Sequence, residues 1–207
     1  MNIERSTLRG RDRAALLIVD VQKDFCAGGT LAVPHSDHVV DVLNRYIDEA
    51  VAHGVTIYAT RDWHPAVTSH FKPYGGPWPV HCVQGTDGAG FHAGLRLPPT
   101  TIVVSKGEDP DSAGYSAFEG RTSEGTPLLT DLHDRGIDHL YIGGLATDYC
   151  VKHTALAALA AGLSVTVLTD AIAGVDARPG DSARALAEMR EKGTDVASGS
   201  RLHQAAR

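Results

Sequence analysis

Short apolar runs recur along the chain and alternate with stretches in which apolar residues have a helical spacing. The first run covers residues 14–21 and is interrupted only by Asp20. A run of this kind is typical of a strand that is buried on both faces, as the strands of parallel sheets are. We expect further strands at residues 55–60, 101–106, 138–143 and 164–169, and a short last strand at 195–197.

Between these runs the apolar positions follow the period of an amphipathic helix. Residues 36–54 are the clearest case, with Ser36 or Asp37 as the capping residue and Gly54 at the end. The alternation of strands and helices predicts an α/β fold in three layers (αβα), with a mostly parallel six-stranded sheet that helices cover on both faces. Further helices are expected at residues 126–136, 148–161 and 181–193.

Composition places the chain among ordinary globular proteins. It has 207 residues and a formal net charge of −6, with 43 % hydrophobic and 21 % charged residues. These values exclude the collagen-like, coiled-coil and disordered classes. The length suits one domain that covers residues 1–207. The negative net charge argues against a nucleic-acid partner because it repels phosphate.

The sequence predicts neither export nor membrane insertion. Residues 1–13 are polar and charged, so they lack the apolar centre of a signal peptide. The most apolar stretch, residues 154–168, is broken by Gly162 and is too short to span a bilayer. The 3 cysteines are too few and too far apart for a disulfide scaffold. We therefore expect a cytoplasmic location and no membrane partner.

Polar side chains gather where the predicted strands end. Asp20 closes the first strand and Lys106 closes the third. Residues 61–64 follow the second strand, and residues 143–150 follow the fourth and end in Cys150. Ligands of open parallel sheets bind beyond the carboxyl ends of the strands. We therefore expect these groups to converge on one rim, where nearby aromatic residues would form the walls for a ring-shaped ligand.

The long connection between the second and third strands holds residue types that bind metals. Asp62 and His64 are two residues apart, so they point the same way in an extended segment, and His70 and His81 follow. Imidazole and carboxylate suit Zn, Fe or Mn. The structural alternative is that these are ordinary loop histidines in solvent, since the chain has 11 histidines. Cys82 is either a rival ligand or part of the core.

Asp20, Lys106 and Cys150 can together support nucleophilic catalysis. A free thiol has a pKa of about 8.5, so it needs a base such as a carboxylate at neutral pH. Cys150 follows a Gly-Gly turn near a predicted helix start, where backbone N–H groups favour an anion and can hold an oxyanion. In the structural alternative, Asp20 is a strand-end cap, Lys106 is a surface charge and Cys150 is a small buried apolar residue. This alternative fits Asp20 and Lys106 poorly, because each ends a buried strand, where an unpaired charge is costly.

Five motifs in the same order and at compatible spacing resemble the nicotinamidases of the isochorismatase-like cysteine hydrolase superfamily. The resemblance extends from about residue 14 to residue 197, and five motifs together are far more specific than any one of them. The motifs are Val19-Asp20-Val21-Gln22-Lys23-Asp24-Phe25, Arg61-Asp62-Trp63-His64-Pro65, Trp78-Pro79-Val80-His81-Cys82, Lys106-Gly107 and Gly144-Leu145-Ala146-Thr147-Asp148-Tyr149-Cys150-Val151.

The resemblance implies hydrolysis of nicotinamide to nicotinate and ammonia through a cysteine thioester, as a step of NAD salvage. It implies a catalytic triad and one divalent metal ion, with zinc favoured over iron or manganese. The implied triad is Asp20, Lys106 and Cys150, and the implied metal ligands are Asp62, His64 and His81, with His70 as a fourth.

The resemblance also implies the surroundings of the substrate. A cis peptide bond between Ala146 and Thr147 would turn the backbone amides of Ala146 and Cys150 toward the oxyanion. The implied walls of the pyridine pocket are Phe25, Trp78 and Tyr115.

Other activities of the same superfamily are less compatible with these residues. Amidases that act on N-carbamoyl or ureide substrates generally lack the metal cluster, and a true isochorismatase does not use the cysteine. A non-catalytic metal-binding domain of the same fold would be expected to lose a triad position, and all three are present. The oligomeric state stays open, although the apolar helix at residues 155–161 leaves room for a homo-oligomer.

Overall fold

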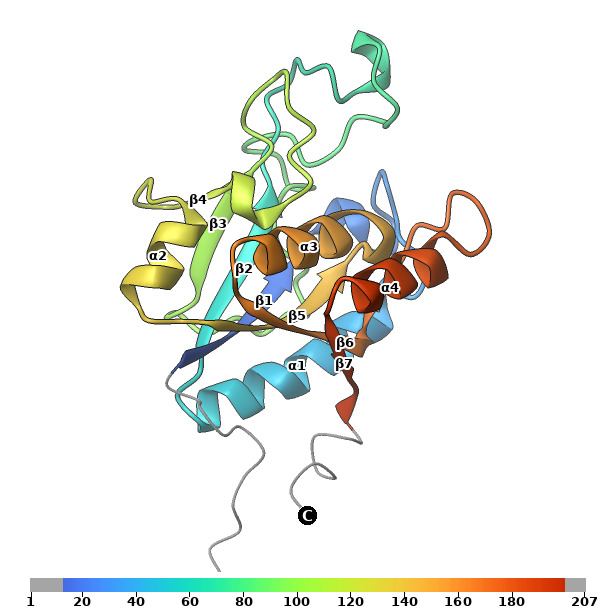
Figure 1. The fold of residues 1–207 in the computed structure, drawn as a ribbon. Helices are drawn as coiled ribbons and strands as arrows, with labels where there is room; N and C mark the ends of the chain where they lie inside the picture. Colours follow the sequence, from blue (N-terminus) through green and yellow to red (C-terminus); the bar gives the residue numbers. More distant parts are fainter. Residues whose placement is uncertain (1–12, 200–207) are drawn as a thin grey trace, which may run out of the picture.

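The computed structural model describes residues 13–199, which form a seven-stranded sheet between layers of helices (Figure 1). The strands lie in the order β4-β3-β2-β1-β5-β6-β7, so β1 is central and the chain winds outward in both directions from it. The strands are β1 (Ala14–Val19), β2 (Thr56–Asp62), β3 (Ile102–Lys106), β4 (Arg121–Thr122), β5 (His139–Leu145), β6 (Ser164–Ala173) and β7 (Asp195–Ala197).

The predicted α/β fold and its parallel sheet are confirmed. Six strands pair in parallel and correspond to the six predicted runs. The structure adds β4, which pairs antiparallel with β3 at the edge of the sheet through Val104–Thr122 and Ser105–Arg121. A strand of two residues is too short to show a repeating pattern of apolar positions, so β4 could not be predicted.

The four α-helices identified within residues 13–199 cover the two faces of the sheet. Figure 1 shows α1 on one face and α2, α3 and α4 on the other. Residues 13–199 also form short helical turns of fewer than six residues. Three are 3-10 turns, η2 (Lys23–Phe25), η3 (Lys72–Tyr74) and η4 (Ala117–Glu119), and one is a π-helical turn, η5 (Thr147–Val151). The α-helices are α1 (Ser36–Ala52), α2 (Leu128–Asp134), α3 (Lys152–Ala160) and α4 (Asp181–Glu191).

The central strand supplies both hydrophobic cores. Leu16 and Ile18 of β1 pack with α1 in one cluster, whereas Leu17 and Val19 pack with α2 and α3 in the other. Side chains of a strand point alternately to the two faces, so a strand between two helical layers must be apolar at every position. This explains why the first run of the sequence shows no alternation.

The helix that follows β5 departs from the prediction at its start. A single helix was expected over residues 148–161, but the segment begins with the π turn η5 and continues as α3. π turns inside helices occur frequently at functional sites. The turn changes the direction in which the residues after β5 face, and Cys150 lies within it.

Two long connections rise beyond the carboxyl ends of β2 and β3, where Figure 1 shows them side by side. They are tied together at Pro110, whose carbonyl accepts hydrogen bonds from the hydroxyl of Thr68 at 2.8 Å and the backbone N–H of Ser69 at 2.9 Å. A parallel bridge between Phe71 and Trp78 closes the first connection on itself. The loops therefore form a fixed wall above the sheet.

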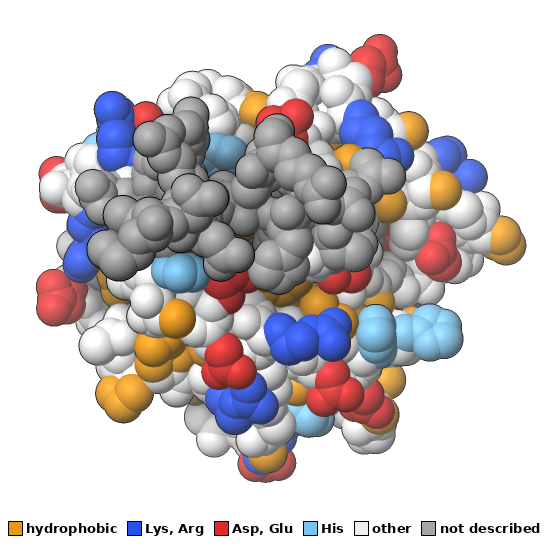
Figure 2. Space-filling model, turned by 90° about the horizontal axis from the view of Figure 1, so that it is seen from below, with side chains coloured by type: hydrophobic (Ala, Val, Ile, Leu, Met, Phe, Trp, Pro, Cys, Tyr) orange, Lys and Arg blue, Asp and Glu red, His pale blue; other side chains and the backbone are white. Residues whose placement is uncertain are grey.

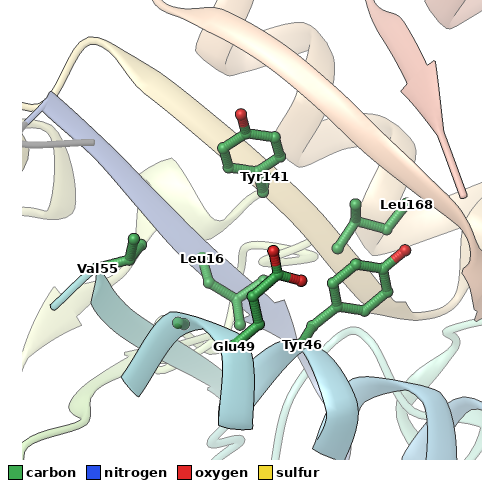
Figure 3. Close-up of a pocket in the computed structure, with 7 residues that line it drawn as sticks. Leu16, Tyr46, Glu49, Val55, Tyr141 and Leu168 are labelled. Carbon is green, nitrogen blue, oxygen red and sulfur yellow. The ribbon is translucent and has the colours of Figure 1, made fainter. Parts of the chain in front are cut away.

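An apolar pocket of about 350 Å³ lies beneath α1 (Figure 3). Tyr46 and Glu49 of α1 point toward Leu16, Tyr141 and Leu168 of the sheet. The Tyr46 hydroxyl donates a hydrogen bond to Asp170 at 2.9 Å. The pocket is a gap in helix-to-sheet packing.

The outer surface carries charges of both signs. Seen from below in Figure 2, Lys and Arg side chains intermix with Asp and Glu side chains over the part of this face that described residues form. Exposed ion pairs such as Arg96 with Asp48, at 2.6 Å, contribute little to stability because water screens them. Among the helices of residues 13–199, none has the length and hydropathy needed to cross a membrane.

Candidate catalytic and metal-binding site

The carboxyl ends of four neighbouring strands bring the predicted triad together. Asp20 follows β1 directly, Lys106 is the last residue of β3, and Cys150 lies in η5 just after β5. Asp62, the last residue of β2, is the register partner of Lys106. All four side chains are buried, with Asp20 and Lys106 at most 1 % exposed. Charges are buried in this way only where they are paired.

The Lys106 ammonium is the centre of this charge cluster. Its Nζ lies 2.7 Å from Oδ2 of Asp20 and also donates a hydrogen bond to Oδ1 of Asp62. It donates to the Gly114 carbonyl at 3.0 Å and lies 3.5 Å from the Cys150 sulfur. Carboxylate oxygens of Asp20 and Asp62 and the Cys150 sulfur all lie within 4.8 Å of one another. One cation therefore faces two carboxylates and a thiol.

Burial and the central cation set the protonation of the cluster. Burial raises the pKa of Cys150 well above its ordinary value, against the opposing effect of Lys106. Burial also raises the pKa of Asp20, which makes this carboxylate a better base. Burial alone would lower the pKa of Lys106, but Asp20 and Asp62 raise it well above its ordinary value. The ammonium therefore stays charged, and the thiol needs a base to ionise.

Thr60 fixes the Asp20 carboxylate, and sequence reasoning missed it. Its hydroxyl donates to Oδ1 of Asp20 at 2.6 Å and accepts the backbone N–H of Asp20 at 3.1 Å. Thr60 is fully buried in β2, next to β1 in the sheet. The two bonds leave Oδ2 of Asp20 facing Lys106. The run at residues 55–60 also contains Thr56 and Tyr58, so a hydroxyl at its end did not distinguish Thr60.

Gln22 fixes Asp62 in a similar way and was also missed. Its side-chain oxygen accepts the backbone N–H of Asp62 at 2.7 Å, and its amide nitrogen donates to the Asp62 carbonyl at 2.8 Å. The same nitrogen donates to the Ala89 carbonyl at 2.9 Å. Gln22 is fully buried, so these bonds satisfy its side chain. The end of β2 is thereby held to the segment after β1.

Three of the four predicted metal ligands form a compact histidine cluster. Ring nitrogens of His64, His70 and His81 lie within 4.8 Å of one another, and all three residues are buried. Nε2 of His64 and Nε2 of His81 lie 3.5 Å and 3.9 Å from Oδ2 of Asp62. The alternative of ordinary loop histidines in solvent is wrong for these three.

The donor set fits a divalent metal ion. Nδ1 of His64 pairs with the Gly107 carbonyl at 2.9 Å, and Nδ1 of His81 pairs with the Pro79 carbonyl at 2.7 Å. Such partners orient metal-binding histidines in known sites. Nε2 of His64 is buried without a hydrogen-bond partner, which is costly unless it has a ligand. Burial lowers the pKa of His70 to about 4, which keeps its ring in the neutral form that binds metals.

Cys82 belongs to the core. It is fully buried among the apolar residues that pack with α1, and burial raises the pKa of its thiol. Its backbone N–H donates to Oδ2 of Asp24 at 2.7 Å. Of the two interpretations that the sequence left open, the structure favours core packing.

A pocket of about 360 Å³ opens onto both the thiol and the histidine cluster. The three predicted wall residues line it, and the Trp78 indole N–H donates to the Tyr115 hydroxyl at 2.9 Å. Tyr149, one of the aromatic residues near the predicted rim but not one of the three implied wall residues, packs its ring edge-on against Trp78 at a centroid distance of 4.9 Å. The lining residues are Phe25, Leu31, Val33, Asp62, His70, Trp78, His81, Tyr115, Leu145, Ala146, Tyr149, Cys150 and Val175.

The predicted position of the cis peptide bond is wrong by one residue. The cis bond joins Leu145 and Ala146, whereas Ala146–Thr147 was expected. β5 ends at Leu145 and Thr147 already belongs to the π turn, so the chain changes direction before Ala146. Ala146 and Cys150 both line the pocket, while Thr147 is buried outside the lining.

Comparison with known proteins gives a consistent picture. The model of the isochorismatase domain family matches residues 14–200. The chain is 47 % identical to a nicotinamidase of Escherichia coli over 199 residues, covering 88 % of this chain and 93 % of that protein.

Solved structures agree with the sequence comparison. The pyrazinamidase of Pyrococcus horikoshii in complex with zinc is 44 % identical, with a TM-score of 0.83 over 90 % of this chain and 99 % of that chain. PnC1 from L. infantum in complex with nicotinate is 34 % identical, with a TM-score of 0.81 over 97 % of this chain and 98 % of that chain.

Proposed function

This chain belongs to the isochorismatase family, and from that premise we propose that it is a nicotinamidase, which hydrolyses nicotinamide to nicotinate and ammonia. The observation that carries the proposal is the buried Lys106 ammonium between the Asp20 carboxylate and the Cys150 thiol, at the edge of an aromatic pocket. The neighbouring histidine cluster supports a substrate whose ring bears a nitrogen. The product acid is a precursor that NAD salvage can use.

In the proposed reaction Asp20 is the base and Cys150 the nucleophile. The Asp20 carboxylate takes the thiol proton, and the sulfur attacks the carboxamide carbon. Lys106 stabilises the ionised pair because its ammonium lies within 3.5 Å of the sulfur and 2.7 Å of the carboxylate. Thr60 holds the other carboxylate oxygen, so the basic oxygen is directed toward Lys106 and the thiol.

The tetrahedral intermediate then loses ammonia. We assign its oxyanion to the backbone N–H groups of Ala146 and Cys150, both of which belong to pocket-lining residues. One such donor contributes about 3–4 kcal/mol to transition-state stabilisation in other enzymes. Protonated Asp20 returns its proton to the leaving nitrogen as the C–N bond breaks. A thioester on Cys150 and free ammonia result.

Hydrolysis of the thioester completes the cycle. Asp20 removes a proton from water, whose oxygen attacks the thioester carbon. The C–S bond breaks, nicotinate leaves, and the proton returns to the Cys150 sulfur through Asp20. The same carboxylate thus serves as base and acid in both halves of the reaction.

The residues Asp62, His64, His70 and His81 would hold one divalent ion, for which zinc is the favoured candidate. When bound, the ion would supply a positive anchor that orients the pyridine ring. Asp62 also bonds to Lys106, so it joins the metal site to the triad. Phe25, Trp78, Tyr115 and Tyr149 would contact the two faces and the edge of the ring.

Ammonia release from nicotinamide tests the proposal. The purified protein is stripped of metal, reloaded with Zn, Mn or Fe, and assayed with nicotinamide and with benzamide, which lacks the ring nitrogen. We expect turnover of nicotinamide by at least one loaded form and a much higher KM for benzamide. The Cys150→Ala variant is the control for contaminating amidases. No ammonia release from nicotinamide by any loaded form would overturn the proposal.

A further inference from the structure

The segment that joins β6 to α4 forms one side of the pocket and has no role in the reaction described above. Its residue Val175 lines the pocket and packs against the core that includes Phe25 and Val33. Figure 1 shows this connection beside α4, on the same end of the sheet as the segment that follows β1. An apolar wall at this position limits the width of a ligand.

A buried carboxylate connects this wall, residues 174–180 between β6 and α4, to the catalytic turn, which is the π turn η5 that contains Cys150. Asp148 lies two residues before Cys150 and is 7 % exposed. Its Oδ1 accepts the backbone N–H of Val175 at 3.0 Å, and its Oδ2 accepts the backbone N–H of Asp176 at 2.8 Å. Hydrogen bonds to a carboxylate are stronger than those between neutral groups. Both oxygens of Asp148 are therefore used to hold two consecutive residues of the wall.

A second carboxylate continues the connection to α4. Oδ1 of Asp176 accepts the backbone N–H of Ser182 at 2.8 Å, and its Oδ2 accepts the Ser182 hydroxyl at 2.8 Å. Asp176 has a φ of 49°, a left-handed conformation that Asp tolerates better than most residues. The wall is thus held from both ends, at the catalytic turn and at the first turn of α4.

Gly174 shows how closely these groups approach. A Cβ atom at this position would lie 1.8 Å from the Ser182 hydroxyl oxygen and 3.0 Å from Oδ1 of Asp148. The backbone of the wall therefore approaches both anchoring groups closely on the side where a side chain would project. Such an approach is possible only without a side chain.

We propose that Asp148, Asp176 and Ser182 form a latch that positions Val175, and that Val175 determines how wide a heteroaromatic carboxamide the pocket accepts. The substrate part of this inference rests on the proposed function. The latch residues are positioning residues, because none of the three lines the pocket. Asp148 holds the backbone of the wall, and the Asp176 carboxylate ties the wall to Ser182. They set substrate affinity and selectivity, and the chemistry at Cys150 stays with the triad.

Substitution of Val175 tests the wall. The Val175→Ala variant loses two methyl groups, so its KM for nicotinamide should rise roughly tenfold. Its kcat/KM for ring-methylated nicotinamides should rise relative to nicotinamide. The Val175→Leu variant should shift the same ratio in the opposite direction. Unchanged ratios in both variants would contradict the assignment of Val175.

Substitution at the far end of the latch tests the positioning role without touching the catalytic turn. Asp176→Ala and Ser182→Ala should raise the KM for nicotinamide severalfold and leave kcat within about twofold, because each removes a bond that orders the wall. Asp176→Asn keeps one acceptor oxygen and should give an intermediate KM. Arg178→Ala is the matched control, since Arg178 lies in the same connection with its side chain 84 % exposed.

The rate at which iodoacetamide alkylates Cys150 separates a latch from a general structural role. In the Asp176→Ala and Ser182→Ala variants this rate should equal that of the unaltered protein, while the KM changes. If kcat and thiol reactivity fell by the same factor by which KM rose, these residues would only maintain the fold, and the inference would be overturned. An Arg178→Ala variant with the same rise in KM would also contradict it.

A further readout does not depend on turnover. The ratio of Cys150 alkylation rates with a bulky aryl maleimide and with N-ethylmaleimide should rise several-fold in Val175→Ala and in Asp176→Ala. A protein that releases no ammonia from nicotinamide but shows this change would contradict the proposed function and support the wall. An active protein with an unchanged ratio would support the function and overturn the wall.

Discussion

Two of the pockets formed by residues 13–199 are nearly equal in size, and they differ in almost every other respect. The pocket at the carboxyl ends of the strands has a volume of about 360 Å³ and is lined by the Asp62 carboxylate and the Cys150 thiol, behind which Asp20 and Lys106 are buried. The pocket beneath α1 has a volume of about 350 Å³ and is lined mainly by apolar groups of the core. The comparison shows that volume and apolar lining do not identify a catalytic site.

The first pocket differs from the second in the charged and polar side chains that are buried around it, since burying such groups costs free energy. Asp20, Asp62 and Lys106 stay charged in the interior only because each is paired. Buried Thr60 holds the Asp20 carboxylate, and buried Gln22 holds the backbone of Asp62. Burying charges in this way offers little net stability compared with apolar packing. The second pocket has the opposite character, since Leu16, Ala50 and Leu168 are buried there as ordinary core residues.

The largest difference between the pockets should appear on removal of the sulfur. Cys150→Ala deletes the nucleophile, so we expect kcat for nicotinamide to fall by roughly 10⁴-fold or more while nicotinate still binds. Ammonia release and calorimetric titration with nicotinate measure the two effects. Full activity in this variant would end the thioester mechanism.

Removal of the metal should be the next largest effect. Exhaustive chelation should abolish ammonia release from nicotinamide or raise its KM strongly, because an ion held by His64, His70 and His81 would no longer anchor the pyridine ring. Activity should return on addition of Zn, Mn or Fe. Full activity of a protein shown by elemental analysis to be free of metal would contradict a functional role for this cluster.

Thr60 should affect turnover with little effect on substrate affinity. Thr60→Val has nearly the same shape but removes the hydrogen bond to the Asp20 carboxylate, so kcat should fall about 10- to 100-fold. Thr60→Ser retains the hydroxyl and should recover most of the activity. Metal content measured in parallel shows whether nearby Asp62 is disturbed. Equal activity in the Val and Ser variants would show that Thr60 does not orient the base.

The apolar pocket should respond in stability and not in catalysis. Leu16 is 3 % exposed, so Leu16→Ala should lower the free energy of unfolding by about 2–5 kcal/mol. Urea titration measures this loss, and the kcat for nicotinamide in the absence of urea should stay within about twofold of the unaltered protein. A loss of kcat as large as that in Thr60→Val would give this pocket a catalytic role.

The smallest effect is expected at the rim of the apolar pocket. Tyr46→Phe removes the hydrogen bond to Asp170 and should cost about 0.5–1.5 kcal/mol of unfolding free energy, with kcat and KM unchanged. The measurement is again urea titration combined with ammonia release. A change in KM for nicotinamide would indicate coupling between the two pockets.

The sequence predicted the fold and the position of the site because both depend on local patterns. Apolar runs with no alternation indicated strands between two helical layers, and charged residues at the ends of those runs indicated the rim. Asp20, Lys106 and Cys150 could therefore be proposed together before any contact was known. The structure then brought them within bonding distance of one another.

The groups that the sequence missed depend on contacts between distant segments. Thr60 and Gln22 act across 40 residues of sequence, through the register of β1 against β2. Val175 becomes a wall only because the connection after β6 folds back over the catalytic turn. Tyr149 lay inside a motif, but the sequence did not tell which way the π turn would direct its ring.

Trapping the acyl group during turnover tests whether Cys150 is the nucleophile. The protein is mixed with nicotinamide, quenched in acid within milliseconds to seconds, digested and analysed by mass spectrometry. We expect one nicotinoyl group on the peptide that contains Cys150, formed as ammonia is released and absent in Cys150→Ala. Ammonia release by that variant, or an acyl group on Cys26 or Cys82 in place of Cys150, would contradict it.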